Sequence, residues 1–362
     1  MNKEAILDRA VGAIVGAFIG DALGMGVHWY YDLEEMRKDH GEWVSDYRDP
    51  KPGRYHDQLK AGELTQSGYI LKLMLESLHA KGGYSAEHFA SVLDEKLFTK
   101  MDGTPAAGPG GYTSQSIRNA YRMRQKGVGW EGGHCASTAD TTEAIERNLA
   151  LGVRYANNPT KLAEAVSADT LLTQNDEMLI SMTVAFSATL SQLIRGAPMD
   201  DKISYLMMDE VKSGVLPFHC VTGDDLAPPK PGDPDPPRAG RFASPDALLT
   251  QSTCAAAAKD PNISIEPAWR VSLVYGMPCA AYHILPAAYY LAARFSDDFE
   301  GAVLHAVNGG GQNCARTMLT GALVGAQVGL QKIPQRFIDG LKDKDEILKL
   351  ANSVAGQLIA DM

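Results

Sequence analysis

The sequence predicts an all-α protein, and three observations support this fold class. Apolar residues recur at helical spacing in several stretches, for example over Ile70–Leu78. No stretch sustains the alternation of apolar and polar residues that is typical of a half-buried strand. Glycines stand four residues apart in two distant segments, which leaves a groove along one face of a helix.

The N-terminal segment predicts a long buried helix. The run from Ala10 to Val27 is apolar, but glycines interrupt it and Asp21 would lie in the hydrocarbon of a membrane, so we expect a core helix. Asp21 is expected either to cap another segment or to belong to a site. The glycine spacing of this helix matches that of a late helix, and the two are predicted to cross with their backbones in close contact. The two sets are Gly12, Gly16, Gly20 and Gly24, and Gly321, Gly325 and Gly329.

Apolar spacing and start and stop signals predict the other helices. Asp140 and Glu143 have the spacing of a capping box, and Ser296 is the expected N-cap of a late helix. Gly82 is expected to end one helix, and Pro159 to begin another. The expected helices cover about residues 32–41, 65–82, 85–100, 140–155, 159–172, 177–195, 278–294, 296–308 and 313–329, with two more near residues 334 and 346.

Residues from about 216 to 247 interrupt this pattern. The segment is dense in proline, glycine and aspartate and lacks apolar residues that could pack. Apolar helices resume after it, and the two glycine sets lie on opposite sides of it. We therefore expect a surface insertion within a single domain of residues 1–362.

Composition and charge narrow the class of protein. The chain has 362 residues, of which 45% are hydrophobic and 22% charged, and a formal net charge of -10 at pH 7. That charge argues against nucleic acid or an anionic membrane as the main partner. The five cysteines are far apart and form no CxxC pair, so they suggest neither a disulfide framework nor a zinc site. Reduced thiols in a cytoplasm fit best.

The stretch Asn308–Gly329 is predicted to carry chemistry. The glycines at 309–311 lead into a helix start, a geometry that binds anions through unpaired N–H groups and the helix dipole. Cys314 and Arg316 fall in the first turn, where the dipole and the guanidinium both favour a thiolate. The alternative is that the glycines only permit close packing and that Cys314 is a small buried apolar residue.

With these pieces in place, the sequence resembles the ADP-ribosylglycohydrolase family over almost its full length. The resemblance implies an all-α, orthogonally packed single domain and a small-molecule ligand of the ADP-ribose type. The segments that carry it are AVGAIVGAFIGDALG at 10–24, LTQSGYILKLMLESL at 64–78, TQND at 173–176 and FEGAVLHAVNGGGQNCARTMLTGALVGAQVGLQKIP at 299–334.

The departures from the family pattern concern the metal site. Family hydrolases hold two magnesium ions through a Thr-Asp-Asp-Thr type motif and a Gly-Gly-Asp-x-Asp-Thr type motif. Mg²⁺ prefers anionic oxygen ligands, so the replacements here predict no dinuclear magnesium site, no metal ligands and no cofactor. The family's TH-type histidine also becomes Gln174, and its Ser-Asn-Gly phosphate loop becomes residues Ser137 to Ala139. The four residues that replace metal carboxylates are Gln66, Ser67, Gln312 and Cys314.

This pattern resembles the metal-less branch that includes the lens J-crystallins and selenoprotein J. The leading hypothesis is a hydrolase-like protein that binds a ribosyl or nucleotide-type ligand without metal. Cys314 would be its nucleophile or acid–base thiol, and Asp21, Glu63 or Asp57 its general base. The expected substrate-binding residues are Thr65, Gln66, Ser67, Ser137, Gly310, Gly311, Gln312, Asn313 and Arg316.

Two rival hypotheses come from other functional classes. The first is a binding or structural protein without turnover, because the family's chemistry depends on the metal clamp that is lost here. The second is thiol redox chemistry at Cys314, which the absence of a second cysteine nearby disfavours. The sequence leaves the oligomeric state open.

Overall fold

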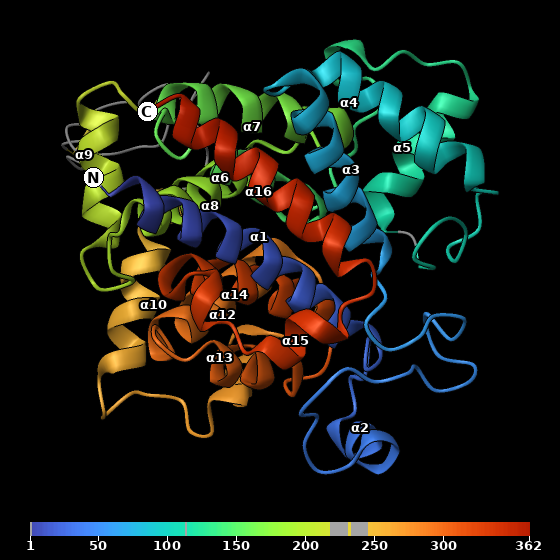
Figure 1. The fold of residues 1–362 in the computed structure, drawn as a ribbon, viewed down its shortest axis with the longest axis vertical. Coiled ribbons are helices and arrows are strands. Elements are labelled where there is room, and N and C mark those ends of the chain that lie inside the picture. The colour runs from blue at the N-terminus through green and yellow to red at the C-terminus, as the bar shows by residue number, and fades with distance from the viewer. Residues whose placement is uncertain (1, 113, 218–230, 233–244) are drawn as a thin grey trace.

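The computed structural model describes residues 2–112, 114–217, 231–232 and 245–362, and consists of helices packed around one core (Figure 1). Within these residues the β-type pairings are two isolated bridges, Ser137 with Gln174 and Thr141 with Ala280. The prediction of an all-α fold is therefore confirmed. The insertion predicted at about 216–247 lies mostly outside the described residues.

Helices α1 (Lys3–Met25) and α14 (Asn313–Val328) cross backbone against backbone at the centre of the molecule. A Cβ atom on Gly12 would lie 2.5 Å from the carbonyl oxygen of Gly325, and one on Gly16 would lie 2.9 Å from the carbonyl carbon of Gly321. No side chain fits between the helices at these points. The crossing predicted from the glycine spacing is confirmed.

The other long helices lie on two sides of α1 (Figure 1). Helix α16 packs along α1, and the two chain ends lie side by side, with Lys3 Nζ donating to the carbonyl oxygen of Ile359 at 3.3 Å. On one side are α3 (Gln66–Lys81), α6 (Glu143–Arg154), α7 (Pro159–Thr173), α8 (Glu177–Arg195) and α16 (Lys344–Ala360). On the other are α10 (Thr250–Lys259), α12 (Ala281–Arg294) and α13 (Phe299–Val307).

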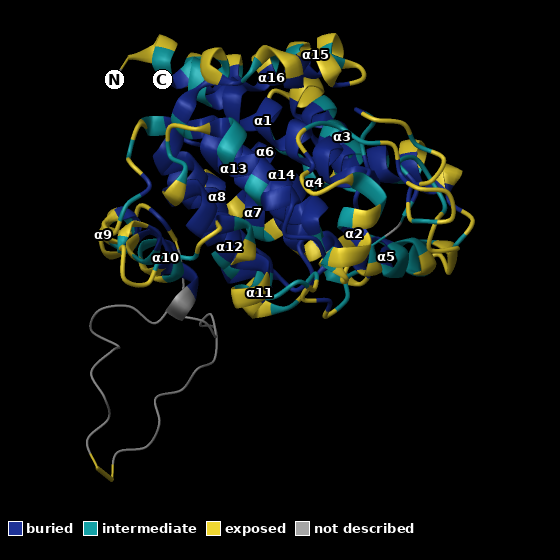
Figure 2. Ribbon diagram, turned by 90° about the horizontal axis from the view of Figure 1, so that it is seen from below, coloured by how far each residue is buried: buried dark blue, intermediate teal, exposed yellow. Residues whose placement is uncertain are grey.

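Shorter helices surround this core, and exposed residues lie on them and on the connecting loops (Figure 2). Helix α4 continues through a π-helical turn, Leu93–Leu97, and a 3-10 turn, Phe98–Lys100. Of the peripheral helices, α5, α9 and α11 are absent from the sequence-based prediction, as is α10 of the core. The peripheral helices are α2 (Leu33–His40), α4 (Ala86–Val92), α5 (Gln115–Gln125), α9 (Ile203–Lys212), α11 (Val271–Tyr275) and α15 (Gln335–Gly340).

Two predicted helix starts are wrong. Helix α6 begins at Glu143 with Thr142 at the N-cap, so Asp140 is not part of a capping box. The carbonyl oxygen of Asp140 instead accepts the Ala281 N–H at 2.8 Å, which holds it outside the helix. Helix α13 is capped by Asp298 and not by Ser296. In both cases several residues could cap, and the path of the chain selects one of them.

Helix α8 is long and apolar enough to cross a membrane by length and composition alone. In this structure, 83% of its most apolar window is buried inside the protein. It packs against α6 and α7, and this burial accounts for its apolar composition.

Candidate functional site

The glycine loop before α14 packs tightly against two other segments. Gly310 and Gly311 have φ of 61° and 60°, and a Cβ on either would lie 2.6 Å from a carbonyl oxygen, that of Tyr30 or of Met277. The N–H of Gly311 donates to Tyr30 at 2.7 Å, and the N–H of Gln312 donates to Met277 at 2.9 Å. These amides were expected to hold an anion, but the protein's own carbonyl oxygens already occupy them. The glycines are there because the backbones approach closely.

Gln312 stands at the N-cap of α14 and connects the loop to the residues that follow α1. Its side-chain oxygen accepts a hydrogen bond from the indole N–H of Trp29. The same oxygen lies 2.7 Å from Nε2 of His28. Gln312 therefore lies at the start of α14, as the sequence predicts, but its side-chain oxygen is already hydrogen-bonded to Trp29 and His28.

His28 contacts a second histidine from the irregular segment before α3. Its Nδ1 lies 2.7 Å from Nε2 of His56, whose Nδ1 lies 3.1 Å from the carbonyl oxygen of Gly110. Both rings are buried, and burial lowers the pKa of each imidazole below its ordinary value. Trp29 and His56 have φ of 63° and 66°, a conformation that bulky residues rarely adopt and that often marks functional sites.

Cys314 lies in the first turn of α14 and is 4% exposed. A Cβ on Gly24 would lie 2.5 Å from its Cα, so α1 covers it directly. Burial raises the pKa of the Cys314 thiol well above its ordinary value, the carboxyl groups of Asp21 and Glu146 raise it further, and Arg316 acts in the opposite direction. This direction is the reverse of the prediction, because desolvation outweighs the helix dipole and the guanidinium.

Asp21 caps helix α3 from the side of α1. Its two carboxylate oxygens accept the N–H of Thr65 at 2.8 Å and the hydroxyl of Thr65 at 2.5 Å. Burial raises the pKa of Asp21 to about 6, although hydrogen bonds from Thr65 and the Gly68 amide lower it. Of the two roles left open by the sequence, the structure shows the cap.

The other residues expected at the start of α3 have separate partners. Gln66 is buried, and its amide nitrogen donates to the carbonyl oxygen of Ala107 at 3.3 Å. Ser67 hydrogen-bonds the carboxyl group of Glu146. The start of α3 therefore joins α1 to α6 through polar side chains.

Glu146 is a candidate site residue that the sequence analysis did not name. It is 2% exposed on α6, and Thr142 donates its hydroxyl to Oε1 at 2.5 Å. Burial raises the pKa of Glu146 to about 7, and the charge of Glu143 adds to the rise. A glutamate one turn into a helix ordinarily faces solvent, and nothing in the local sequence shows that this one points inward.

Three other expected site residues serve the fold. Arg316 is fully buried, and its guanidinium donates to the carbonyl oxygens of Ala306 at 3.0 Å and Gly310 at 2.5 Å. Asn313 donates to Val27 at 2.9 Å from a fully buried position. Their partners are backbone carbonyls, so both side chains fix the loop. Ser137 pairs with the TQND segment, and its N–H donates to the carbonyl oxygen of Thr173 at 3.0 Å.

The structure brings one polar group of side chains together, which we call the polar cluster. Hydrogen bonds and close electrostatic contacts link its members, which come from α1, α3, α6, α14 and the segment before α3. Rings of Trp29 and Tyr112 pack beside His28, with their own centroids 4.6 Å apart, and Tyr55 packs against Trp29. The polar cluster consists of Asp21, His28, His56, Thr65, Ser67, Glu146, Gln312 and Cys314.

The dinuclear magnesium site implied by the resemblance does not fit these residues. Gln66 and Gln312 are neutral amides whose side chains already contact protein groups, and Cys314 offers a thiol. Mg²⁺ needs several hard, anionic oxygen ligands in octahedral geometry. The replacements supply none at these positions.

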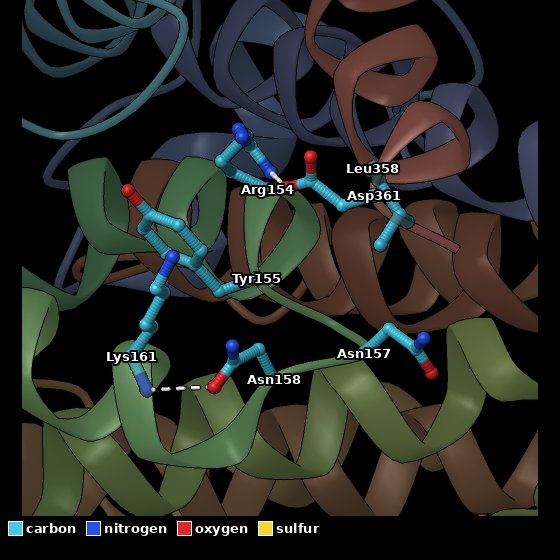
Figure 3. A pocket seen from close by; sticks show the side chains of 7 residues that line it. All are labelled: Arg154, Tyr155, Asn157, Asn158, Lys161, Leu358 and Asp361. Atoms are coloured by element: carbon cyan, nitrogen blue, oxygen red, sulfur yellow. Dashed lines mark hydrogen bonds and ion pairs between the residues drawn. The ribbon is translucent and has the colours of Figure 1, made fainter.

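A different pocket, of about 260 Å³, lies between α6, α7 and the end of α16 (Figure 3). Arg154 and Asp361 pair across it at 2.6 Å, and Lys161 lies at its other side. The pocket shares no lining residue with the polar cluster. Arg154, one of the two cationic residues that line this pocket, is therefore already paired with a carboxylate.

Comparisons with known proteins identify the family. The sequence model of the ADP-ribosylglycohydrolase family matches residues 2–361. An uncharacterized protein of Archaeoglobus fulgidus is 25% identical over 341 residues, which cover 94% of each chain. Crystallin J1A of Tripedalia cystophora is 23% identical over 373 residues, which cover 98% of each chain.

A solved structure shows the same fold. The structure of an ADP-ribosylglycohydrolase-related protein complex has a TM-score of 0.63 and 20% sequence identity, and the match covers 98% of this chain and 99% of that one. The family match spans nearly the whole sequence, and the fold agrees with it. The chain belongs to the ADP-ribosylglycohydrolase family.

Proposed function

We propose that this protein is an ADP-ribosylglycohydrolase-like hydrolase that binds a ribosyl or nucleotide-type ligand at the polar cluster without a dinuclear magnesium site. Family membership supports the ligand class, and ADP-ribose is the first candidate. The observation that carries the proposal is Glu146, a buried carboxyl group beside Asp21 and Cys314 whose pKa is raised to about 7. Strongly shifted carboxyl groups are concentrated at functional sites.

Such a carboxyl group suits acid–base chemistry at neutral pH. Hydrolysis of a ribosyl bond breaks the bond between the sugar carbon and its leaving group, and forms a bond from that carbon to a water oxygen. In the proposed reaction Glu146 gives its proton to the leaving group. The attacking water passes a proton to a second carboxylate, for which Glu143 and Asp21 are the neighbouring candidates. Trp29 and Tyr112 offer aromatic faces for a base or a sugar.

In this proposal Cys314 is not the nucleophile that the sequence-based hypothesis made it. Its raised pKa keeps it a thiol in the free protein, so nucleophilic attack by a preformed thiolate is disfavoured. A Cys314→Ser variant that still hydrolyses an ADP-ribosylated substrate would remove the nucleophile role and leave the carboxyl mechanism.

Calorimetric titration with ADP-ribose, first without added magnesium and then with it, tests the proposed ligand. We expect binding in both conditions, weaker binding by Tyr112→Ala and unchanged binding by Tyr205→Ala, which alters an exposed tyrosine on α9. We expect Glu146→Gln to bind ligand but to lose turnover. Absence of binding in both conditions would contradict the proposal.

A structural protein without turnover is the second candidate. The match to Crystallin J1A over 98% of both chains favours it. It predicts that ADP-ribose neither binds nor raises the melting temperature, and that Glu146→Gln changes only stability.

A further inference from the structure

The hydrogen-bond partners of His28 and His56 fix which ring nitrogens carry protons. The indole of Trp29 is a donor only, so the Gln312 side-chain oxygen that it contacts is an acceptor. Nε2 of His28 lies 2.7 Å from the same oxygen and must donate to it. Nδ1 of His56 lies 3.1 Å from the carbonyl oxygen of Gly110 and must also donate. Both N–H groups therefore point away from the other histidine.

The inner nitrogens of the two neutral rings are then left with lone pairs that face each other. Nδ1 of His28 and Nε2 of His56 are 2.7 Å apart. The contacts Gln312–His28, His28–His56 and His56–Gly110 would each need one proton on a ring nitrogen. Two neutral imidazoles supply only two such protons. Two facing lone pairs at this distance repel each other, and a cation between the rings, a third proton or a metal ion, would remove that repulsion.

Cys314 offers a third potential ligand close to the two rings. One potential ligand atom from each of His28, His56 and Cys314 lies within 4.8 Å of the other two, and all three residues are buried. Zinc bonds of about 2.0–2.1 Å to nitrogen and about 2.3 Å to sulfur place ligand atoms roughly 3.3–3.7 Å apart in a tetrahedron. Small side-chain shifts reach that arrangement.

The surroundings match those of ligating histidines in proteins. Metal-bound imidazoles donate their outer N–H to a carbonyl, amide or carboxylate oxygen, which orients the ring. Gln312 and Gly110 already fill this role for His28 and His56. His56 also adopts a left-handed backbone conformation, which is uncommon for histidine and is kept where the surroundings enforce it.

We propose that His28 Nδ1, His56 Nε2 and Cys314 Sγ bind one divalent transition-metal ion, with Zn²⁺ as the preferred ion. Two imidazoles and a thiolate form a donor set that suits zinc and excludes magnesium and calcium. Binding releases the thiol proton of Cys314 to solvent, and the metal charge stabilises the thiolate that burial alone disfavours. Three protein ligands leave a fourth position for water or substrate.

This inference departs from the metal-free site expected from the sequence, and its three residues belong to the polar cluster at which the proposed ligand would bind. The cysteines were judged by their spacing along the chain, in which no zinc pattern occurs. The three ligands instead come from positions 28, 56 and 314, which only the fold brings together.

The test uses untagged full-length protein that has been stripped with a chelator, dialysed and titrated with Zn²⁺. Elemental analysis after desalting is expected to find about one zinc per chain. Co²⁺ in place of Zn²⁺ is expected to give the near-ultraviolet charge-transfer band of a thiolate ligand, and that band does not depend on any variant folding correctly. Absence of retained zinc and of this band would overturn the proposal.

Variants then assign the ligands. We expect Cys314→Ser to lose the cobalt charge-transfer band and His56→Gln to lower the retained zinc at least tenfold. The matched controls are Cys279→Ser and His79→Ala, since Cys279 and His79 lie outside the three-residue group, and both variants should bind as the parent does. Circular dichroism establishes that each variant is folded. Retention of the band by folded Cys314→Ser would also refute the assignment. Loss of zinc binding with intact ADP-ribose binding would leave the proposed function standing.

Discussion

Gly20 of α1 approaches Thr317 of α14 so closely that a Cβ atom on Gly20 would lie 2.5 Å from the carbonyl carbon of Thr317. Backbone cannot move aside as the end of a flexible side chain can. The crossing of the two central helices therefore depends on the missing Cβ, and the start of α14, with Cys314 and Gln312, is positioned by that crossing.

Gly20→Ala should consequently destabilise the protein by about 3 kcal/mol or more, because the helices must separate or bend. Urea unfolding followed by circular dichroism measures the loss. The control is Gly356→Ala on α16, where a Cβ meets nothing within 4 Å and helix propensity should raise stability by about 0.5–1 kcal/mol. Equal effects of the two substitutions would contradict the packing argument.

Asp21→Ala should cost about 2–4 kcal/mol, because the N–H and hydroxyl of Thr65 lose their acceptors inside the protein. Asp32→Ala is the matched control, since Asp32 also caps a helix with its carboxylate but does so at the surface, where water replaces it. Its expected cost is about 1 kcal/mol. Chemical denaturation of both variants at one pH measures the two losses in the free energy of unfolding. Similar losses would show that the burial of the Asp21 cap does not increase its contribution to stability.

Glu146 should make the protein less stable as the pH rises towards 8. Its pKa is about 7 in the folded protein and 4.5 ordinarily, so the folded state binds its proton more tightly than the unfolded state does. The resulting stability is complete below pH 4.5 and is lost as the pH rises through 7. Glu146→Gln does not titrate, so it should gain about 3 kcal/mol relative to the parent between these limits.

Unfolding free energies of parent and Glu146→Gln across this pH range measure the effect. Taking the difference between the two proteins removes the contribution of other titrating groups, including the buried histidines, whose lowered pKa values act with the opposite sign. Glu87→Gln at an exposed position of α4 serves as the control. A pH-independent difference for Glu146→Gln would show that the folded protein does not hold this proton.

Removing one partner of the buried ion pair between Arg147 and Asp169 should lower the free energy of unfolding strongly. Replacing both partners by apolar residues should lower it less. The Nε–Oδ2 distance is 2.7 Å, and the two side chains are 1% and 0% exposed. Asp169→Ala leaves an unpaired buried guanidinium and should cost about 3–5 kcal/mol. The double variant Arg147→Met, Asp169→Leu should lose less than this single variant. Lys344→Ala, which breaks an exposed pair with Asp339, should change thermal stability little. A double variant that is less stable than Asp169→Ala would contradict this prediction.

The sequence predicted the helices where local signals agree with one another. Helix α8 has the predicted bounds, Glu177–Arg195, and α2 lies between Asp32 and Gly41 as expected. Helix α5 was missed although it is amphipathic, because it is short and mostly polar and follows a glycine-rich loop. The start of α13 was misplaced by two residues, since Ser296 and Asp298 both have side chains that can cap.

The candidate site was predicted less completely, because its chemistry depends on contacts across the chain. The sequence identified Cys314 from its place at a helix start, and the family resemblance identified Gln312 as the replacement of a metal carboxylate. It gave the wrong direction for the Cys314 pKa, since a helix dipole is visible locally whereas burial is not. His28, His56 and Glu146 were not singled out, because an isolated histidine or glutamate has no informative spacing.

The sequence by itself determined the all-α class, the family and the crossing of α1 with α14. The class and the crossing follow from helical periodicity and from glycines four residues apart, which are properties of neighbouring residues, whereas the family follows from segments matched along the whole chain. Only the tertiary structure decided that Asp21 caps α3, that Gly311 and Arg316 bond to the protein's own backbone, and that His28 meets His56 and Cys314. The physical reason is that desolvation and hydrogen-bond pairing are set by groups distant in sequence, which no local pattern records.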